Sequence, residues 1–290
     1  MRTLLTSVAA ALCLAACSGP QLLNVATPSL SGEWQKTTDI AYGAHERQKL
    51  DIYTPTTPGP HPVLIFVHGG SWERGQKEDY PWLGRRFASE GYLTAVINYR
   101  LAPTFDYDDF MADTAKAVAF MHTEAPRFGG NPEHLFLMGH SAGAYNVVQV
   151  ALAEEFLVAE DTSPQIIDGV VGVAGPYSFL PLDSDVTRAA FGRADDLEAT
   201  QPINRVAGDA PPMLLLHGVD DDVVSPRNST EMARLLREAG VRGESIAYTD
   251  IDHIEIIVAV GLTGRAPVVA DTTKFLNSLT YTTAEATSAP

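Results

Sequence analysis

The chain has 290 residues, of which 45% are hydrophobic and 19% are charged. This composition excludes a disordered or a fibrous protein, and the length suits one large domain with a substantial core. The formal net charge of −16 argues against nucleic acid as a partner and against electrostatic docking on anionic lipid.

The first predicted element along the chain is an export signal. Arg2 gives a positive start, and the apolar run from Leu4 to Ala16 has 13 residues, which is shorter than the ~20 that a membrane-spanning helix needs. The run ends in Leu-Ala-Ala-Cys17, which resembles the lipobox of bacterial lipoproteins, where the signal is cut before a cysteine that then carries lipid. The alternative is an ordinary signal cleaved near Ala16 and followed by an unrelated cysteine.

Both ends of the chain therefore lie outside the expected folded domain. We expect 1–16 to be a signal peptide and 17–34 to be a tether, with Cys17 as the lipidated residue. The protein is then expected in the cell envelope, lipid-anchored to the outer membrane on its periplasmic or surface face. After loss of Cys13 with the signal, Cys17 is the only cysteine, so no internal disulfide can form. Residues 281–290 are expected to be a flexible polar tail.

Between these ends, 35–280 alternates strand and helix patterns, which predicts one α/β domain with a mostly parallel central sheet flanked by helices. The long irregular stretch at 176–210 is expected to form a small lid. The predicted strands cover 49–53, 62–68, 92–99, 134–139, 166–174, 213–216 and 245–248, and the predicted helices cover 80–90, 107–124, 142–156, 226–239 and 268–279, with one more helix from Ile254.

The motif Gly-His-Ser141-Ala-Gly follows the predicted strand at 134–139 and precedes the predicted helix at 142–156. A serine in this setting is typical of a nucleophile elbow, a strained turn that holds the hydroxyl above the sheet. The small flanking residues suit the tight turn, and the helix that follows points its N-terminus at a developing oxyanion. We therefore predict Ser141 as a nucleophile.

The segment His-Gly-Gly-Ser-Trp at 68–72 follows a buried strand and is similar to the HGGG-type oxyanion motif of lipases and esterases. Glycine lets such a loop present its backbone N–H groups to a carbonyl oxygen with no side chain in the way. By position, the N–H groups of Gly70, Ser71 and Ala142 are the predicted oxyanion donors. Taken alone, two glycines after a strand usually form only a turn, so this prediction depends on the elbow that follows.

Carboxylates and a histidine follow the last two predicted strands. The cluster Asp220 to Asp222 comes after the strand at 213–216, and His253 is the only histidine after that cluster. His253 alone can therefore complete the chain order Ser, Asp, His. An acidic cluster in a loop is usually a solvated turn, so we expect only one of the three aspartates to act. The histidines show no paired metal-ligand spacing, and we expect no metal site.

These motifs, HGGSW, INYRLAP, GHSAGA, HGVDDDVVSP and YTDIDHIEII, resemble those of the carboxylesterase and feruloyl-esterase-like branch of the α/β-hydrolases, to which kynurenine formamidases are closely related. The resemblance covers about residues 50–279. In these esterases the acid stands four residues after the strand-end histidine, which selects Asp221. Two positions depart from the pattern: Ser71 stands where many of these enzymes have a third glycine, and Asp252 stands where the family often has glycine.

The resemblance implies a serine carboxylic ester hydrolase that works through an acyl-enzyme and needs no cofactor, with a small-molecule ester as its substrate. Trp72, Tyr177 and Phe179 are expected to wall a compact aromatic pocket that favours short acyl groups. An N-acyl amide hydrolase of the formamidase kind would use the same residues. A non-catalytic binding protein of the envelope on the same fold is the alternative from another class. The oligomeric state is left open.

Overall fold

A computed structural model of the chain describes residues 33–262 and 264–287. The expected signal peptide and Cys17 lie outside these described residues. None of the helices in the described part of the chain is long and apolar enough to cross a membrane.

A single sheet of eight strands runs through the described residues, in the order β1-β2-β4-β3-β5-β6-β7-β8. The six strands from β4 to β8 along this order are parallel, and β2 pairs antiparallel with both β1 and β4. The mostly parallel sheet predicted from the sequence is confirmed. The strands are β1 (Trp34–Ala41), β2 (Lys49–Pro55), β3 (His61–Val67), β4 (Leu93–Ile97), β5 (Gly130–His140), β6 (Gly169–Val173), β7 (Met213–Gly218) and β8 (Gly243–Tyr248).

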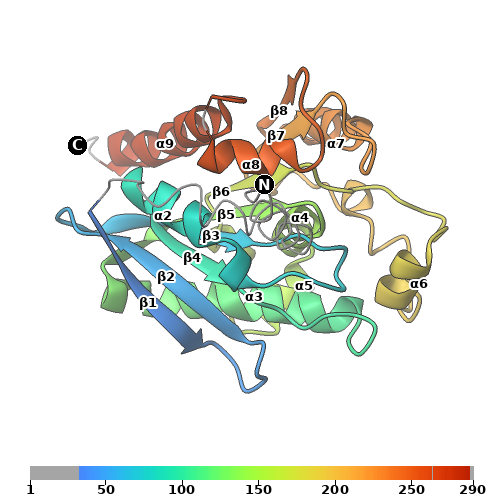
Figure 1. Cartoon of the computed structure of the whole chain (residues 1–290), viewed down its shortest axis with the longest axis horizontal. Coiled ribbons are helices and arrows are strands. Elements are labelled where there is room, and N and C mark those ends of the chain that lie inside the picture. The colour runs from blue at the N-terminus through green and yellow to red at the C-terminus, as the bar shows by residue number, and fades with distance from the viewer. Residues whose placement is uncertain (1–32, 263, 288–290) are drawn as a thin grey trace, which may run out of the picture.

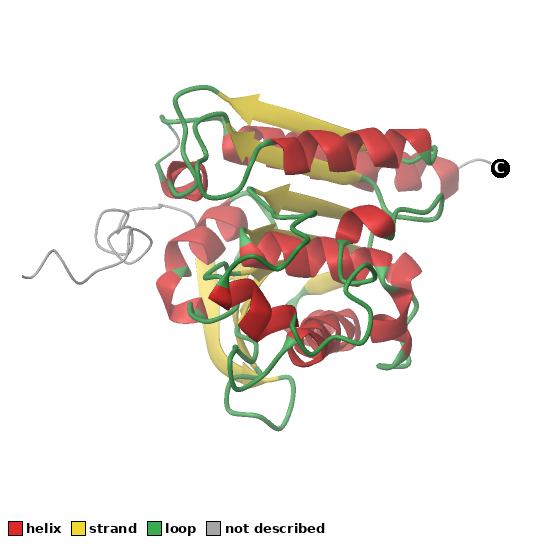
Figure 2. Ribbon diagram, turned by 90° about the vertical axis from the view of Figure 1, so that its right-hand side faces the viewer, coloured by secondary structure: helices red, strands yellow, loops and turns green. Residues whose placement is uncertain are grey.

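Helices cover both faces of the sheet (Figures 1 and 2). One face packs against α3 (Tyr107–Glu124), α4 (Ala142–Leu152), α5 (Glu154–Val158), α6 (Asp185–Phe191) and α7 (Arg227–Glu238). The other face packs against α2 (Pro81–Ser89), α8 (Glu255–Gly261) and α9 (Val268–Thr287). Single turns of 3₁₀ helix occur at Lys77–Asp79, Ala125–Phe128, Pro164–Ile166 and Pro202–Asn204.

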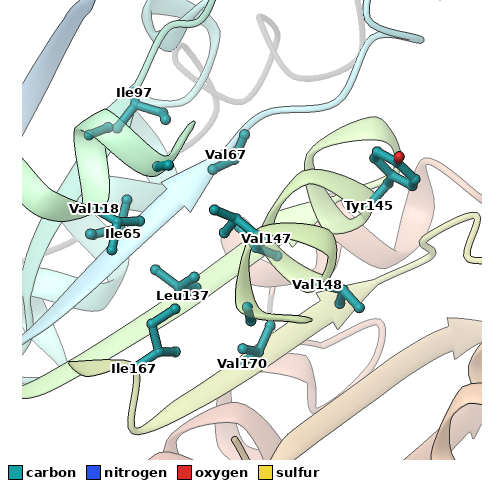
Figure 3. Packing of buried hydrophobic residues seen from close by; sticks show 14 of the residues in the cluster. Ile65, Val67, Ile97, Val118, Leu137, Tyr145, Val147, Val148, Ile167 and Val170 are labelled. Carbon is teal, nitrogen blue, oxygen red and sulfur yellow. The ribbon is translucent and has the colours of Figure 1, made fainter. Parts of the chain in front are cut away.

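Each central strand contributes side chains to both layers, because successive residues of a strand point to opposite faces. In β3, Ile65 and Val67 belong to the apolar cluster under α4, whereas Phe66 belongs to the cluster under α2 and α8. Figure 3 shows Val147 of α4 over Leu137 of the sheet. Burial on both faces explains the continuous apolar runs of the sequence, and it holds the carboxyl ends of the strands in fixed positions.

Three elements differ from the sequence prediction. β1 begins at the last residue of the expected tether, and its side chains are mostly exposed, so it lacks the apolar alternation by which a strand is recognised. The helix predicted at 142–156 is divided at Ala153 into α4 and α5. Helix α9 continues to Thr287, so the backbone of 281–287 is helical where we expected a flexible tail.

Candidate active site

Ser141 lies at the sharp turn between β5 and α4. Its backbone has φ 53° and ψ −121°, a conformation that residues other than glycine rarely adopt. The turn is tight because α4 packs directly on β3. A Cβ atom added to Gly143 would lie 2.1 Å from the carbonyl oxygen of Val67, so only glycine fits there. The strained turn therefore presents the Ser141 hydroxyl at the carboxyl ends of the strands.

The structure brings Ser141, His253 and Asp221 together from three separate loops. Nε2 of His253 lies 2.9 Å from Oγ of Ser141, and its Nδ1 lies 2.8 Å from Oδ2 of Asp221. An ionised carboxylate can only accept, so Nδ1 carries the proton and donates to Asp221, which leaves Nε2 to accept from the serine hydroxyl. This tautomer suits His253 to take up the serine proton.

Asp221 differs sharply from its two acidic neighbours. It is buried, whereas Asp220 and Asp222 are exposed. Its Oδ1 accepts hydrogen bonds from the backbone N–H groups of Val223 (3.0 Å) and Val224 (2.8 Å). Burial alone would raise the pKa of Asp221, but hydrogen bonds from His217, His253 and the Val224 N–H group hold it well below its usual range. The carboxylate is therefore ionised.

Two further histidines hold this arrangement in place. Nε2 of His217 lies 3.1 Å from Oδ2 of Asp221 and 2.9 Å from the carbonyl oxygen of Val224. Both of those oxygens are acceptors, so Nε2 donates, and Nδ1 of His217 accepts from the Ser229 hydroxyl at 2.8 Å. His140 similarly fixes the base, because its Nε2 lies 2.9 Å from the carbonyl oxygen of His253. The sequence placed both histidines inside motifs, and the structure gives each a defined partner.

The loop that carries Gly70 and Ser71 packs against the elbow. A Cβ atom added to Gly69 would lie 3.0 Å from Cβ of Ser141. Gly70 has φ 122°, and a Cβ atom there would lie 2.1 Å from the carbonyl oxygen of Arg74, so this turn requires glycine. Within the described residues, no acceptor is recorded for the N–H groups of Gly70, Ser71 and Ala142. These three donors are thus available to an oxygen bound beside Ser141.

Ser141 and His253 open into a cavity of about 780 Å³. Gly69, Gly70, Ser71 and His140 of its wall belong to motifs that the sequence singled out. Most of the remaining wall comes from loop residues with no predicted role, among them Val223 beside the acid and Ile254 beside the base. Both of these apolar side chains are well exposed. The described residues that line the cavity are Arg47, Gly69, Gly70, Ser71, Arg74, Gly75, Gln76, Asp79, Tyr80, Leu101, His140, Ser141, Val223, His253 and Ile254.

The predicted aromatic pocket of Trp72, Tyr177 and Phe179 is wrong, since none of the three lines this cavity. Trp72 and Tyr177 are fully or almost fully buried, and Phe179 is partly buried. The indole of Trp72 packs edge-on against Phe191 at 4.8 Å between ring centroids, and its Nε1 donates to Oδ1 of Asn146 at 3.0 Å. Trp72 belongs to the same loop as Gly70 and Ser71, so burial of its ring in the core anchors this loop.

The expected lid also lies away from this cavity. Among the described residues of 176–210, which carry α6, none lines its wall. The segment instead adds Phe179 and Phe191 to the aromatic cluster around Trp72.

The structure explains one of the two departures from the resembling pattern. Oδ1 of Asp252 accepts hydrogen bonds at 2.8 Å from the backbone N–H groups of both Ile254 and Glu255. Asp252 therefore satisfies two backbone N–H groups at the start of α8, whose N-cap residue Ile254 makes no capping side-chain bond. Ser71, the other departure, has φ 56°, the left-handed region in which glycine is favoured. No group of three metal-ligand side chains occurs among the described residues.

The chain is similar to several known proteins. The BD-FAE family model matches residues 50–236. A probable isoprenylcysteine alpha-carbonyl methylesterase from Oryza sativa subsp. japonica is 29% identical over 261 residues, which cover 82% of this chain and 63% of that protein. Esterase LipQ from Mycobacterium tuberculosis is 29% identical over 280 residues, which cover 86% of this chain and 64% of that protein. The chain thus spans less than two thirds of the length of these relatives.

Among solved structures, an inhibited esterase B from Lactobacillus rhamnosis has a TM-score of 0.77 at 20% sequence identity, over 93% of this chain and 94% of that one. A truncated carbohydrate esterase from gut microbiota has a TM-score of 0.76 at 18% identity, over 87% of this chain and 99% of that one. These likenesses confirm the α/β-hydrolase fold.

Proposed function

The chain belongs to the BD-FAE family, and on this premise we propose that it is a serine hydrolase that cleaves carboxylic esters through an acyl-enzyme. The observation that carries the proposal is the unbroken hydrogen-bonded series from Ser141 through His253 to Asp221, with the serine facing a cavity. A protein that only binds ligands would not need a strained serine, an oriented histidine and an ionised aspartate in contact.

In the first step, Oγ of Ser141 attacks the ester carbonyl carbon while Nε2 of His253 takes the hydroxyl proton. The carbonyl oxygen becomes negative and accepts from the N–H groups of Gly70, Ser71 and Ala142. Asp221 stabilises the imidazolium, and its hydrogen bond keeps the ring in the correct tautomer. Collapse of the intermediate passes the proton from His253 to the departing alcohol and leaves the acyl group on Ser141.

In the second step, water replaces the alcohol. His253 takes a proton from the water, whose oxygen attacks the acyl carbon, and the same backbone N–H groups stabilise the second oxyanion. The acid leaves when His253 returns a proton to Ser141. The chemistry requires no cofactor, because the proton moves only between His253 and groups that lie beside it.

We propose that the acyl group of the substrate is short. The cavity of about 780 Å³ falls within the ~300–1,000 Å³ of ordinary small-molecule sites. Its apolar wall is short, since Leu101, Val223 and Ile254 are its aliphatic members. Acyl chains of up to about six carbons fit such a wall, whereas longer chains leave apolar surface in water.

The proposal extends to location. The apolar run that ends at Cys17 supports a lipoprotein signal at 1–16 and a tether at 17–34, with the enzyme held at the cell envelope by lipid. If Cys17 carries the lipid, Cys17→Ser releases the protein into the soluble fraction on cell fractionation. Unchanged membrane association of this variant would contradict the lipid anchor.

A panel of substrates tests the proposed activity. We expect turnover of p-nitrophenyl acetate and butyrate, slower turnover of the octanoate, and little turnover of N-formylaniline. Ser141→Ala should abolish ester turnover while leaving the circular dichroism spectrum and the melting temperature close to those of the parent protein. Faster turnover of N-formylaniline would favour an amide hydrolase. Absence of turnover for every compound would favour a binding protein.

A further inference from the structure

The cavity beside Ser141 is lined by two unlike kinds of side chain. Val223 and Ile254 are apolar, and they are 67% and 44% exposed. Arg47 and Arg74 also line the cavity and are cationic. Two arginines in one small cavity are unexpected in a chain with a formal net charge of −16.

Arg47 comes from the loop between β1 and β2 and is held rigidly. Its Nε donates to the carbonyl oxygen of Tyr99 at 2.6 Å, and its Nη2 donates to the carbonyl oxygen of Gly75 at 2.8 Å. A guanidinium has five N–H donors, so most of the donors of Arg47 remain unused by the described residues. Two backbone carbonyls fix its orientation but do not neutralise its charge.

Arg74 comes from the turn after the oxyanion loop and is exposed. In the part of the chain that the structure describes, its side chain makes no recorded hydrogen bond or ion pair, whereas most of the other arginines pair with a carboxylate, as Arg100 does with Asp113 at 2.7 Å. Asp79 is the one carboxylate among the described lining residues. Oδ1 of Asp79 accepts a hydrogen bond from Nε2 of Gln76 at 3.4 Å. Among the described residues, the guanidinium of Arg74 therefore has no recorded partner of opposite charge.

An unneutralised pair of guanidinium groups favours a bound anion. Arginine donors match the geometry of carboxylate and phosphate oxygens, and such charge-assisted hydrogen bonds are stronger than neutral ones. The negative charge of the rest of the molecule acts over longer distances and is screened beyond ~8–10 Å at physiological ionic strength. The described lining residues carry two guanidinium groups and one carboxylate, that of Asp79, which leaves an excess of one positive charge in the cavity.

We propose that the substrate is an ester with a negatively charged group, which binds to Arg47 and Arg74 while the apolar part lies against Val223 and Ile254. This inference rests on the proposed ester hydrolysis and narrows its substrate class. The charge can belong to the acyl part or to the alcohol part, and either places an anion within one small molecule's length of the ester bond. Hydrolysis then yields the acid and the alcohol of this ester with no further reactant than water.

Two matched pairs of esters test the inference. In the first pair, mono-p-nitrophenyl glutarate carries a carboxylate at the end of the acyl chain, and p-nitrophenyl valerate has the same number of carbon atoms without charge. In the second pair, 4-carboxyphenyl butyrate carries the charge on the alcohol part, and 4-carbamoylphenyl butyrate is its neutral counterpart. The measured quantity is the ratio of kcat/KM for the anionic ester to kcat/KM for the neutral one.

We expect this ratio to exceed about ten in one of the two pairs for the parent protein, in line with a charge-assisted hydrogen bond. Arg74→Gln should lower the ratio about tenfold, and Arg74→Glu should lower it further. Arg127→Gln is the matched control, because Arg127 is an exposed arginine that precedes β5, at the opposite end of the strands, and it should leave the ratio unchanged.

Two results would overturn the inference. One is a ratio at or below one in both pairs for the parent protein. The other is a ratio that Arg74→Gln and Arg74→Glu leave unchanged. Hydrolysis of the neutral esters reports separately on the proposed function, so a protein that cleaves them without preference for charge retains the esterase proposal and loses only the anionic substrate.

Discussion

The reacting groups and the cavity wall of this protein are built in different ways. Ser141, Asp221 and His253 each follow a parallel strand at its carboxyl end, and each is held by hydrogen bonds to other buried groups. The wall is made by single side chains such as Arg74 and Val223, which come from unrelated loops and are exposed. The reacting groups are fixed by the fold, whereas the wall can change without disturbing it.

This difference decides what can be predicted from sequence. A nucleophile elbow needs a strand, a tight turn with glycine, and a helix in immediate succession, so Ser141 has a local pattern. The wall has no such pattern, because its members are neighbours only after folding. Aromatic side chains near the motifs did not identify the wall. Trp72 and Tyr177 are buried in the core, where their rings are removed from water more completely than in a solvated cavity.

The largest expected effect separates the reacting acid from its neighbours. Asp221→Asn should lower kcat by about 10⁴-fold, since the amide cannot hold the correct tautomer of His253 or stabilise the imidazolium. Asp220→Asn and Asp222→Asn are matched controls, because both side chains are exposed, and each should retain activity within about twofold. Steady-state kinetics on p-nitrophenyl butyrate measures all three. If Asp220→Asn or Asp222→Asn is the inactive variant, the assignment of the acid is incorrect.

The second prediction tests whether Trp72 belongs to the core or to the wall. Trp72→Ala removes a buried indole and should lower the free energy of unfolding by about 3–5 kcal/mol. Ile254→Ala, at a partly exposed position in the wall, should change that free energy by about 0.5 kcal/mol or less and raise KM for the longer acyl chains. Urea unfolding and an acyl-chain series measure the two effects.

A milder variant guards against failure to fold. Trp72→Phe should lose less stability than Trp72→Ala and keep the acyl-chain profile of the parent protein. A changed acyl-chain preference in Trp72→Phe at unchanged stability would show that Trp72 lines the cavity.

The third prediction concerns the stability of the fold at low pH and depends on two buried histidines, His68 and His140. Burial lowers the pKa of His68 to about 4 and that of His140 to about 3, whereas a histidine in the unfolded chain titrates near ~6.5. Between these pH values the unfolded state binds more protons than the folded state. The contribution of the two neutral histidines to the free energy of unfolding is therefore fully present above about pH 6.5 and is lost as the pH falls toward 4. Each unit of pKa difference corresponds to about 1.4 kcal/mol.

Urea unfolding at pH 7.5, 5.5 and 4.5 measures this loss, and His140→Gln should flatten the dependence because it removes one of the two groups. A midpoint that stays constant over this range would show that the two histidines are not held neutral by burial.

Most of the architecture could be predicted because apolar runs and helical periodicity are strong signals for buried strands and helices. Tyr107–Glu124 was predicted with the bounds that α3 has. β1 was missed because an exposed edge strand has no buried face to mark it in the sequence. The supporting bonds of His217 to Asp221 and of His140 to the backbone of His253 could not be predicted, since they join residues whose approach depends on the whole sheet.

The most direct test of the account asks which hydroxyl in the cavity is nucleophilic. Ser71 and Ser141 both line it, and only Ser141 is hydrogen-bonded to His253. We predict that a fluorophosphonate probe adds once to the parent protein and that peptide mapping by mass spectrometry finds the adduct on Ser141. Ser71→Ala should be labelled like the parent protein, and Ser141→Ala should not be labelled. An adduct on Ser71, or undiminished labelling of Ser141→Ala, would contradict the account.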